Sequence, residues 1–308
     1  MKRLGPLNLL KFSQWFIGIF SGIGIIAFVA ILFNKAFFNW SFTIDTGLAA
    51  EFGSFFGGLI GTLFGIISVL LIILTLFYQF VENNKNVVAN QFFKMLDYHN
   101  DNVNRLNIMH IDPNKEKEHA ENRRAFVIFK LQLKELLEIT REINKELKLE
   151  LEDKAVIDIA YISFYYGIDD DWPEFLKDKL KGYPNADQIA EKLLNAKRKS
   201  AKKIGRTNQT SLSAYFRNMY NAIKLVDENK YLTKNEKLKY IKILRAQLSN
   251  PELYVLYFNL MSRFGTKWKE KEYITKYEFL KNLPSRYCDI YDPKKDFPMK
   301  YEEEEINP

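Results

Sequence analysis

The sequence contains few of the side chains from which catalytic and metal sites are usually built. Cys288 is the single cysteine among 308 residues, so the chain can form neither an internal disulfide nor a thiolate cluster. The only histidines are His99, His110 and His119, and their spacings of eleven and nine residues do not place two on one helical face, as zinc sites require. We therefore expect a protein of a reducing compartment, without a metal site and without a cofactor.

Signatures of an enzyme are equally scarce. The sequence shows no nucleophile with a neighbouring base and no glycine-rich phosphate loop. The nearest pattern is Arg105 followed by His110, an R-x4-H spacing like that of HEPN-type ribonucleases. The next residue is Leu106, where those enzymes usually carry a polar side chain. We expect the chain not to be an enzyme, with a ribonuclease using Arg105 and His110 as the alternative.

Charge is missing from two long apolar runs, which predict two membrane-spanning helices. Residues 15–33 form an uncharged run of 19 residues and residues 53–81 one of 29, whereas about 20 residues cross the hydrocarbon core. Basic residues concentrate in the segment 1–14 and after residue 81, so the positive-inside rule places both termini in the cytoplasm and the loop 34–52 outside. The first run is too long for a cleaved signal peptide and has no cleavage site. We expect a multi-pass membrane protein.

Glycines recur every four residues at the start of the second run. Gly53, Gly57, Gly61 and Gly65 lie on one predicted helical face, and Gly18 and Gly22 repeat the spacing in the first run. Small residues let two helices approach closely within a bilayer. The sequence leaves open whether this face packs against the other span or against another copy, and we expect the lipid bilayer and a homo-oligomer as partners.

Residues 82–290 predict a cytosolic helical domain. The net charge of +7 is modest, and the one dense basic block, at 197–206, is typical of a solvated helix face, so we expect no nucleic-acid partner. Polar and turn-forming residues at 205–211 suggest a sub-boundary, and the acidic tail 291–308 is expected to be disordered. No strand alternation is apparent, so the fold class is all-α. The expected helices cover 84–108, 115–147, 152–166, 173–181, 185–204 and 267–281.

Several stretches differ from generic amphipathic helix, and they carry a family resemblance. They are residues 92–100, 124–126, 215–224, 245–259 and 276–283. Together with the two N-terminal apolar runs they resemble the phage abortive infection family of AbiC-like bacterial proteins. The resemblance implies a role in defence, in which an infected cell stops growing or dies before phage is released, but implies no settled chemistry.

Polar residues within these stretches form the candidate site. In apolar helical surroundings they must find partners, so we expect a buried network that fixes helix register or lines a ligand or trigger site. The arginines among them suit phosphate or carboxylate. The candidates are Arg217, Asn218, Tyr220, Arg245, Gln247, Glu252 and Asn259, with Asp227 as a further partner.

We therefore expect a membrane effector of abortive infection. Its cytosolic domain would sense infection through a phage-derived trigger or a partner encoded by a neighbouring gene, and its spans would assemble or rearrange to perturb the inner membrane. The alternatives are the membrane-tethered ribonuclease and a non-catalytic scaffold that binds a partner.

Overall fold

The computed structural model describes residues 11, 14–15, 17–19, 21–26, 29, 46–110, 118–168, 173–199 and 204–306. The chain forms two compact units, one comprising residues 1–90 with 229–233 and the other residues 91–228 with 234–308. Apart from one two-stranded hairpin, the described elements are helices, so the all-α class predicted from the sequence is confirmed.

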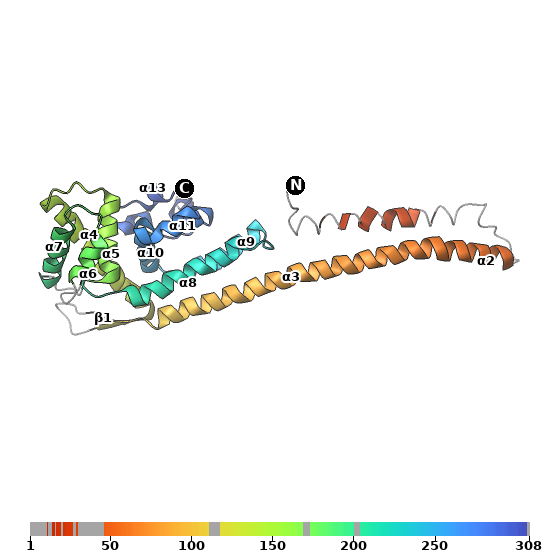
Figure 1. Ribbon diagram of the computed structural model, residues 1–308, viewed down its shortest axis with the longest axis horizontal. Coiled ribbons are helices and arrows are strands. Elements are labelled where there is room, and N and C mark those ends of the chain that lie inside the picture. The colour runs from red at the N-terminus through yellow and green to blue at the C-terminus, as the bar shows by residue number, and fades with distance from the viewer. Residues whose placement is uncertain are drawn as a thin grey trace. The chain divides into compact units, whose positions relative to one another are not determined.

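The first unit is dominated by a long apolar helical segment. Helix α2 (Thr46–Phe55) passes through a π-helical turn (Phe56–Ile60) into α3 (Gly61–Asn104), whose last residues belong to the second unit. The stretch beginning at Gly53 is strongly apolar, and most of it is not buried within the described part of the chain. It is the one helix in the described ranges that is long and apolar enough to cross a membrane (Figure 1).

The helix extends beyond the N-terminal end of the expected span, 53–81, whose bounds in a membrane stay a prediction. Helix α2 begins at Thr46, because Ala and Leu precede Glu51 and a single charge does not interrupt a helix. The expected first span, 15–33, and the loop 34–52 lie largely outside the described residues, which include a short apolar helix over Ile17–Ile26. The two-helix hairpin therefore stays a prediction.

The π-helical turn lies within the glycine stripe, between Gly53 and Gly61. In an α-helix, residues four apart drift by about 40° around the axis at each step. A π-helical turn contains more residues than an α-helical turn, so each residue rotates less around the axis. The step from Gly57 to Gly61 passes through this turn, and the smaller rotation there opposes the α-helical drift. The turn therefore helps to keep the four glycines near one face.

The second unit begins with the end of α3 and a small hairpin. Strands β1 (Asn107–His110) and β2 (Glu118–Glu121) pair antiparallel, with Asn107 opposite Glu121 and His110 opposite Glu118. A single helix over 115–147 is therefore wrong: its first described residues form β2 and a 3-10 turn (Asn122–Arg124), and α4 covers only Ala125–Glu146. Pairing with β1, which is not a local property, decides the conformation of β2.

Helix α10 (Asn250–Met261) forms the centre of the unit. All residues from Glu252 to Leu260 are buried, as expected for a helix that is apolar all round. It packs against α4 and α5 (Asp153–Tyr166), which also pack against each other. Ser249 and Glu252 form a capping box at its start.

The remaining helices surround this core. α5 and α6 (Pro173–Leu180) agree closely with their predicted ranges, whereas α7 (Ala186–Lys199) ends before the predicted residue 204, which lies in a turn. α8 (Gln209–Glu228) and α9 (Lys234–Arg245) follow, and Tyr240 of α9 packs on Phe92 of α3 with ring centroids 5.0 Å apart. The 205–211 segment is tied to the end of α5, since Asn208 Nδ2 donates to the Phe164 carbonyl at 2.8 Å.

The C-terminal part is broken into short turns. A continuous helix over 267–281 is wrong, because α11 (Thr266–Glu270) and α12 (Tyr273–Lys276) are separated at Glu272, whose φ of 52° is left-handed. The expected disordered tail is also ordered through residue 306. It contains the 3-10 turn η4 (Ser285–Cys288), α13 (Pro293–Asp296) and α14 (Glu302–Ile306).

The ordered tail is held by buried and charged contacts. Tyr301 is fully buried, and its hydroxyl donates to the Pro293 carbonyl at 2.9 Å. The Lys294 ammonium lies 2.8 Å from Glu303 and 2.9 Å from Glu304. The acidic run therefore has a cationic partner within the same unit, which composition alone did not indicate.

Candidate functional site

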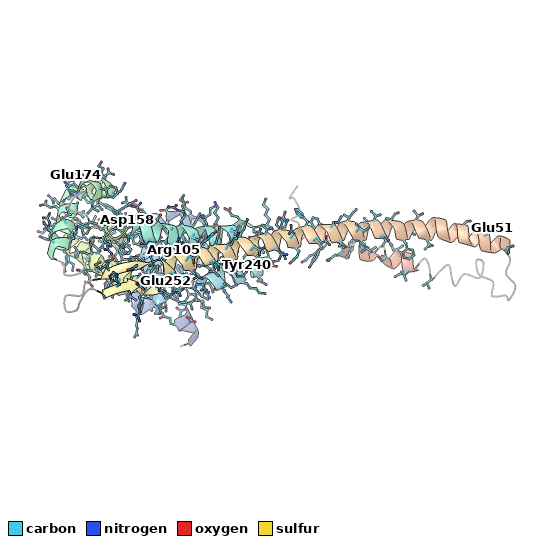
Figure 2. The ribbon with its side chains drawn as sticks, turned by 90° about the horizontal axis from the view of Figure 1, so that it is seen from below. Glu51, Arg105, Asp158, Glu174, Tyr240 and Glu252 are labelled. Atoms are coloured by element: carbon cyan, nitrogen blue, oxygen red, sulfur yellow. The ribbon has the colours of Figure 1, made fainter. Side chains whose placement is uncertain are left out.

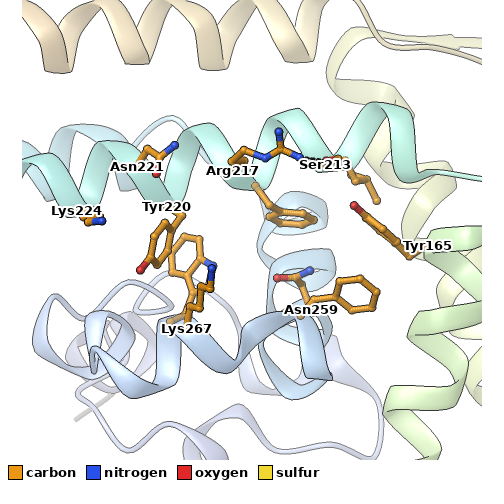
Figure 3. Close-up of a pocket in the computed structure, with 12 residues that line it drawn as sticks. Tyr165, Ser213, Arg217, Tyr220, Asn221, Lys224, Asn259 and Lys267 are labelled. Carbon is orange, nitrogen blue, oxygen red and sulfur yellow. Dashed lines mark hydrogen bonds between the residues drawn. The ribbon is translucent and has the colours of Figure 1, made fainter. Parts of the chain in front are cut away.

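A pocket of about 480 Å³ opens between α8 and the chain that follows α10. Figure 3 shows α8 along one side of it, Asn259 and Lys267 on the opposite side, and Tyr165 of α5 at one end. The lining residues are Tyr165, Leu212, Ser213, Phe216, Arg217, Tyr220, Asn221, Lys224, Asn259, Phe264, Lys267 and Trp268. Its volume falls in the range typical of small-molecule sites.

The charges around the pocket have one sign. Arg217 and Lys224 come from α8 and Lys267 from α11, and no carboxylate is among the lining residues. Within the described part of the chain, none of the three cations forms an ion pair. The Arg217 guanidinium runs along α8 and donates one hydrogen bond, from Nη2 to Ser213 Oγ at 2.8 Å. The site therefore favours an anionic ligand.

Aromatic rings form most of the apolar wall. Tyr220 meets Trp268 edge-on with ring centroids 5.5 Å apart, and Tyr165 lies 4.6 Å from Phe264. Tyr220 and Phe264 are half-buried, whereas Tyr165 and Trp268 are buried, so the first two present ring surface to the pocket. A wall of this kind can stack a planar ligand group.

Asn259 is fixed at the base of the pocket by the core helices. It is 3% exposed, and its Nδ2 donates to the Tyr161 hydroxyl at 2.8 Å. Burial raises the pKa of Tyr161 far above its usual range, so this phenol stays neutral. The amide is therefore held by a neutral partner on α5.

Gly265 lets the chain that follows α10 pack closely against the end of that helix. Helix α10 ends at Met261, and Gly265 follows in a 3-10 turn with an ordinary φ of −84°. A Cβ at this position would lie 2.3 Å from the Leu260 carbonyl oxygen. Glycine is therefore needed for close approach, which positions Phe264, Lys267 and Trp268.

The predicted polar residues do not form one network. Arg217, Tyr220 and Asn259 meet at the pocket, whereas Arg245 donates to the Glu278 carbonyl at 2.8 Å and Gln247 lies half-buried in the turn after α9. The expectation of a single network is wrong because α8, α9 and α10 present these side chains to different neighbours.

Two further candidates hold structural elements together. Asn218 Nδ2 donates to the Met95 carbonyl of α3 at 2.7 Å. Asp227 accepts hydrogen bonds from Lys276 and from the Tyr277 hydroxyl. These contacts join α8 to its neighbours in the second unit and leave both side chains outside the pocket lining.

Glu252 is the centre of a separate buried cluster. Its side chain accepts hydrogen bonds from the Tyr215 hydroxyl at 3.1 Å and the Ser249 N–H at 2.7 Å, and it lies 3.8 Å from the Arg123 guanidinium. Burial, followed by the charge of Glu252, raises the pKa of Tyr215. The adjacent His99 ring is fully buried 4.7 Å from Tyr215, and neither of its nitrogens has a described partner.

The ribonuclease candidates lie elsewhere. Arg105 is exposed in the turn after α3 (Figure 2). His110 is the last residue of β1, and its side chain is not among those that the structure describes. His119 Nδ1 lies 3.0 Å from Asn107 Oδ1 across the hairpin. No group of three metal-ligating side chains occurs in the described ranges.

The glycine stripe faces open space within the described part of the first unit. A Cβ added at Gly53, Gly57, Gly61 or Gly65 would meet nothing within 4 Å, and the same holds at Gly18 and Gly22. Ile67 is buried, and a Cβ at Gly24 would come 4.0 Å from its Cδ1. Large side chains would therefore fit at the stripe without a clash among these residues.

Lys224, Lys267 and Trp268 were missed from the sequence. Lys224 lies seven residues after Arg217, two helical turns along the same face, so periodicity could have linked it to Arg217 and Tyr220. Lys267 and Trp268 carry no such local signal, because only the packing of α11 beside α8 brings them to the pocket.

Residues 207–287 match the family described as putative phage abortive infection protein. The match includes the predicted stretches 215–224, 245–259 and 276–283 and every pocket residue except Tyr165, but not the stretches 92–100 and 124–126. No curated protein and no solved structure matches the chain. The predicted resemblance to the phage abortive infection family is thus confirmed, and the matching segment is the one that builds most of the pocket.

Proposed function

We propose that this protein is a membrane-anchored effector of phage abortive infection. The helical unit senses infection, and the apolar N-terminal segment assembles or rearranges so that the inner membrane loses its barrier function. The family match over 207–287 supports the defence role.

The observation that carries the membrane part is the exposed apolar surface of α3. Phe64, Ile66, Ile72 and Leu76 are each at least half exposed. In water, such a surface would be unfavourable by roughly 25 cal/mol per Å², whereas in hydrocarbon it needs no protein cover. No charged residue occurs between Gly53 and Val81, and Glu82 and Lys85 follow where the helix would leave the bilayer.

The glycine stripe supports assembly through this segment. Its open space gives a partner helix room to approach the backbone, and close backbone approach provides the van der Waals contact that drives helix association in lipid. Either the first span or a second copy of the chain would satisfy this face. In both cases, large side chains at Gly57 and Gly61 would hold the partner away.

The test is the double substitution Gly57→Leu/Gly61→Leu in cells induced to express the full chain. The expected result is loss of toxicity and of membrane depolarisation with unchanged membrane insertion, because leucine meets no described neighbour at either position. Gly58→Leu is the matched control: it makes the same change outside the stripe and should stay toxic.

Chemical crosslinking of the same cells separates the two packing partners. Loss of crosslinked oligomers in the double variant would identify the face as an interface between chains. Full toxicity of the double variant, with insertion intact, would contradict the proposal. If toxicity is lost only when Arg105 or His110 is replaced by Ala, the result would support the ribonuclease alternative instead.

A further inference from the structure

We propose that the pocket between α8 and α11 binds a small nucleotide, a ligand that combines a phosphate group with a planar aromatic base. This inference goes beyond the membrane activity and does not depend on it, because binding can be measured without any effect on cells.

The positive charge of the pocket favours a ligand that carries a phosphate group. Arg217, Lys224 and Lys267 contribute three positive charges with no carboxylate in the lining and no ion pair within the described part of the chain. Cations left unpaired around one cavity repel one another, and an anion bound in the cavity reduces this repulsion. Arg217 uses a single donor, towards Ser213, so most of its planar fork of N–H groups remains for phosphate oxygens.

The aromatic side chains that line the pocket favour a ligand with a planar base. Tyr220 and Phe264 are half-buried and present ring surface from opposite sides, α8 and the turn after α10. Stacking of a base on an aromatic side chain contributes about 1–3 kcal/mol and tolerates every base. An inorganic anion would make no use of the ring surface that these two side chains expose, so the aromatic wall favours an organic phosphate.

Amide groups at the pocket suit the polar edge of a base. Asn259 is held by its hydrogen bond to Tyr161, and Asn221 is exposed on α8 one helical turn from Arg217. Asparagine offers both a donor and acceptors, which match the mixed edges of purines and pyrimidines. The volume of about 480 Å³ accommodates a ligand of this size.

Calorimetric titration of the detergent-solubilised full chain tests the inference. The probes are ATP, GTP, CTP and UTP, with adenosine, ribose 5-phosphate and inorganic phosphate as fragments that lack one half of the ligand. We expect at least one nucleotide to bind, and each fragment to bind about tenfold or more weakly, since either stacking or charge-assisted contacts are lost.

The matched variants are Lys224→Gln/Lys267→Gln and the control Lys239→Gln/Lys242→Gln, which removes two exposed charges from α9. The pocket variant should weaken nucleotide binding by about tenfold or more, while the control leaves it within about twofold, the effect expected of screened distant charges. No binding of any of the four nucleotides, or equal weakening by both variants, would overturn the inference. Circular dichroism verifies that both variants are folded.

Discussion

Replacing the buried Glu252 with glutamine should destabilise the second unit by about 2 kcal/mol. The carboxylate accepts from the Tyr215 hydroxyl and from the Ser249 N–H, and the side chain is fully buried. Glutamine has one acceptor oxygen, so one of these donors loses its acceptor, which costs about 1–3 kcal/mol for a buried group. Arg123 adds little, because its side chain is 44% exposed and can turn to water.

A change of this size is measurable as a thermal shift. For a unit of roughly 200 residues, 1 kcal/mol corresponds to about 2–4 °C in Tm, so Glu252→Gln should lower the midpoint by about 4–8 °C. Unfolding of the detergent-solubilised chain can be followed by circular dichroism. The matched control is Glu270→Gln, an exposed position, where we expect less than about 0.5 kcal/mol.

A double-mutant cycle with Tyr215→Phe isolates the contact itself. If the hydrogen bond to Glu252 stabilises the fold, the two substitutions together should cost less than the sum of their separate effects, with a coupling of about 0.5–3 kcal/mol. A Glu252→Gln midpoint equal to that of Glu270→Gln would refute the reasoning, as would strict additivity with Tyr215→Phe.

Two further substitutions test packing and the ordered tail. Gly265→Ala should destabilise the unit by about 1–3 kcal/mol, because its Cβ would lie 2.3 Å from the Leu260 carbonyl oxygen; an unchanged thermal midpoint would contradict this close approach. Hydrogen bonds from Lys294 and Ser285 lower the pKa of Glu303 to about 2. The charge of Glu303 therefore contributes fully to tail docking above the ordinary glutamate pKa of about 4.5, and this contribution is lost as the pH falls towards 2. The protection of the 302–306 amides against hydrogen exchange, relative to the intrinsic rate at each pH, should fall over that range and in Glu303→Gln at neutral pH, whereas equal protection in the variant would argue against a docked tail.

The sequence predicted the helices whose ends are marked by nearby glycine and proline residues. Gly167, Pro173 and Gly182 mark the ends of α5 and α6, and both helices have nearly the predicted bounds. Ser249 and Glu252, three residues apart in the sequence, likewise mark the start of α10 as a capping box. Strand β2 and the tail could not be predicted in this way, because pairing with β1 and burial of Tyr301 depend on residues distant in the sequence.

The pocket was predictable only along α8. Arg217 and Tyr220 lie three residues apart, so the helical period places them on one face, and both line the pocket. Arg245 was grouped with them because its segment is equally polar within apolar surroundings, yet it contacts the Glu278 carbonyl instead. Residue type and helical period identify which side chains share a face, whereas the packing of α8, α10 and α11 determines which faces meet.

The most direct test of the proposed function is the order of events after induction of the full chain in growing cells. Membrane potential, dye entry and RNA integrity are followed in the same samples, beside the Gly57→Leu/Gly61→Leu variant. The membrane account predicts depolarisation before any loss of RNA, and no depolarisation in the variant. RNA fragmentation while the membrane potential is intact would contradict it.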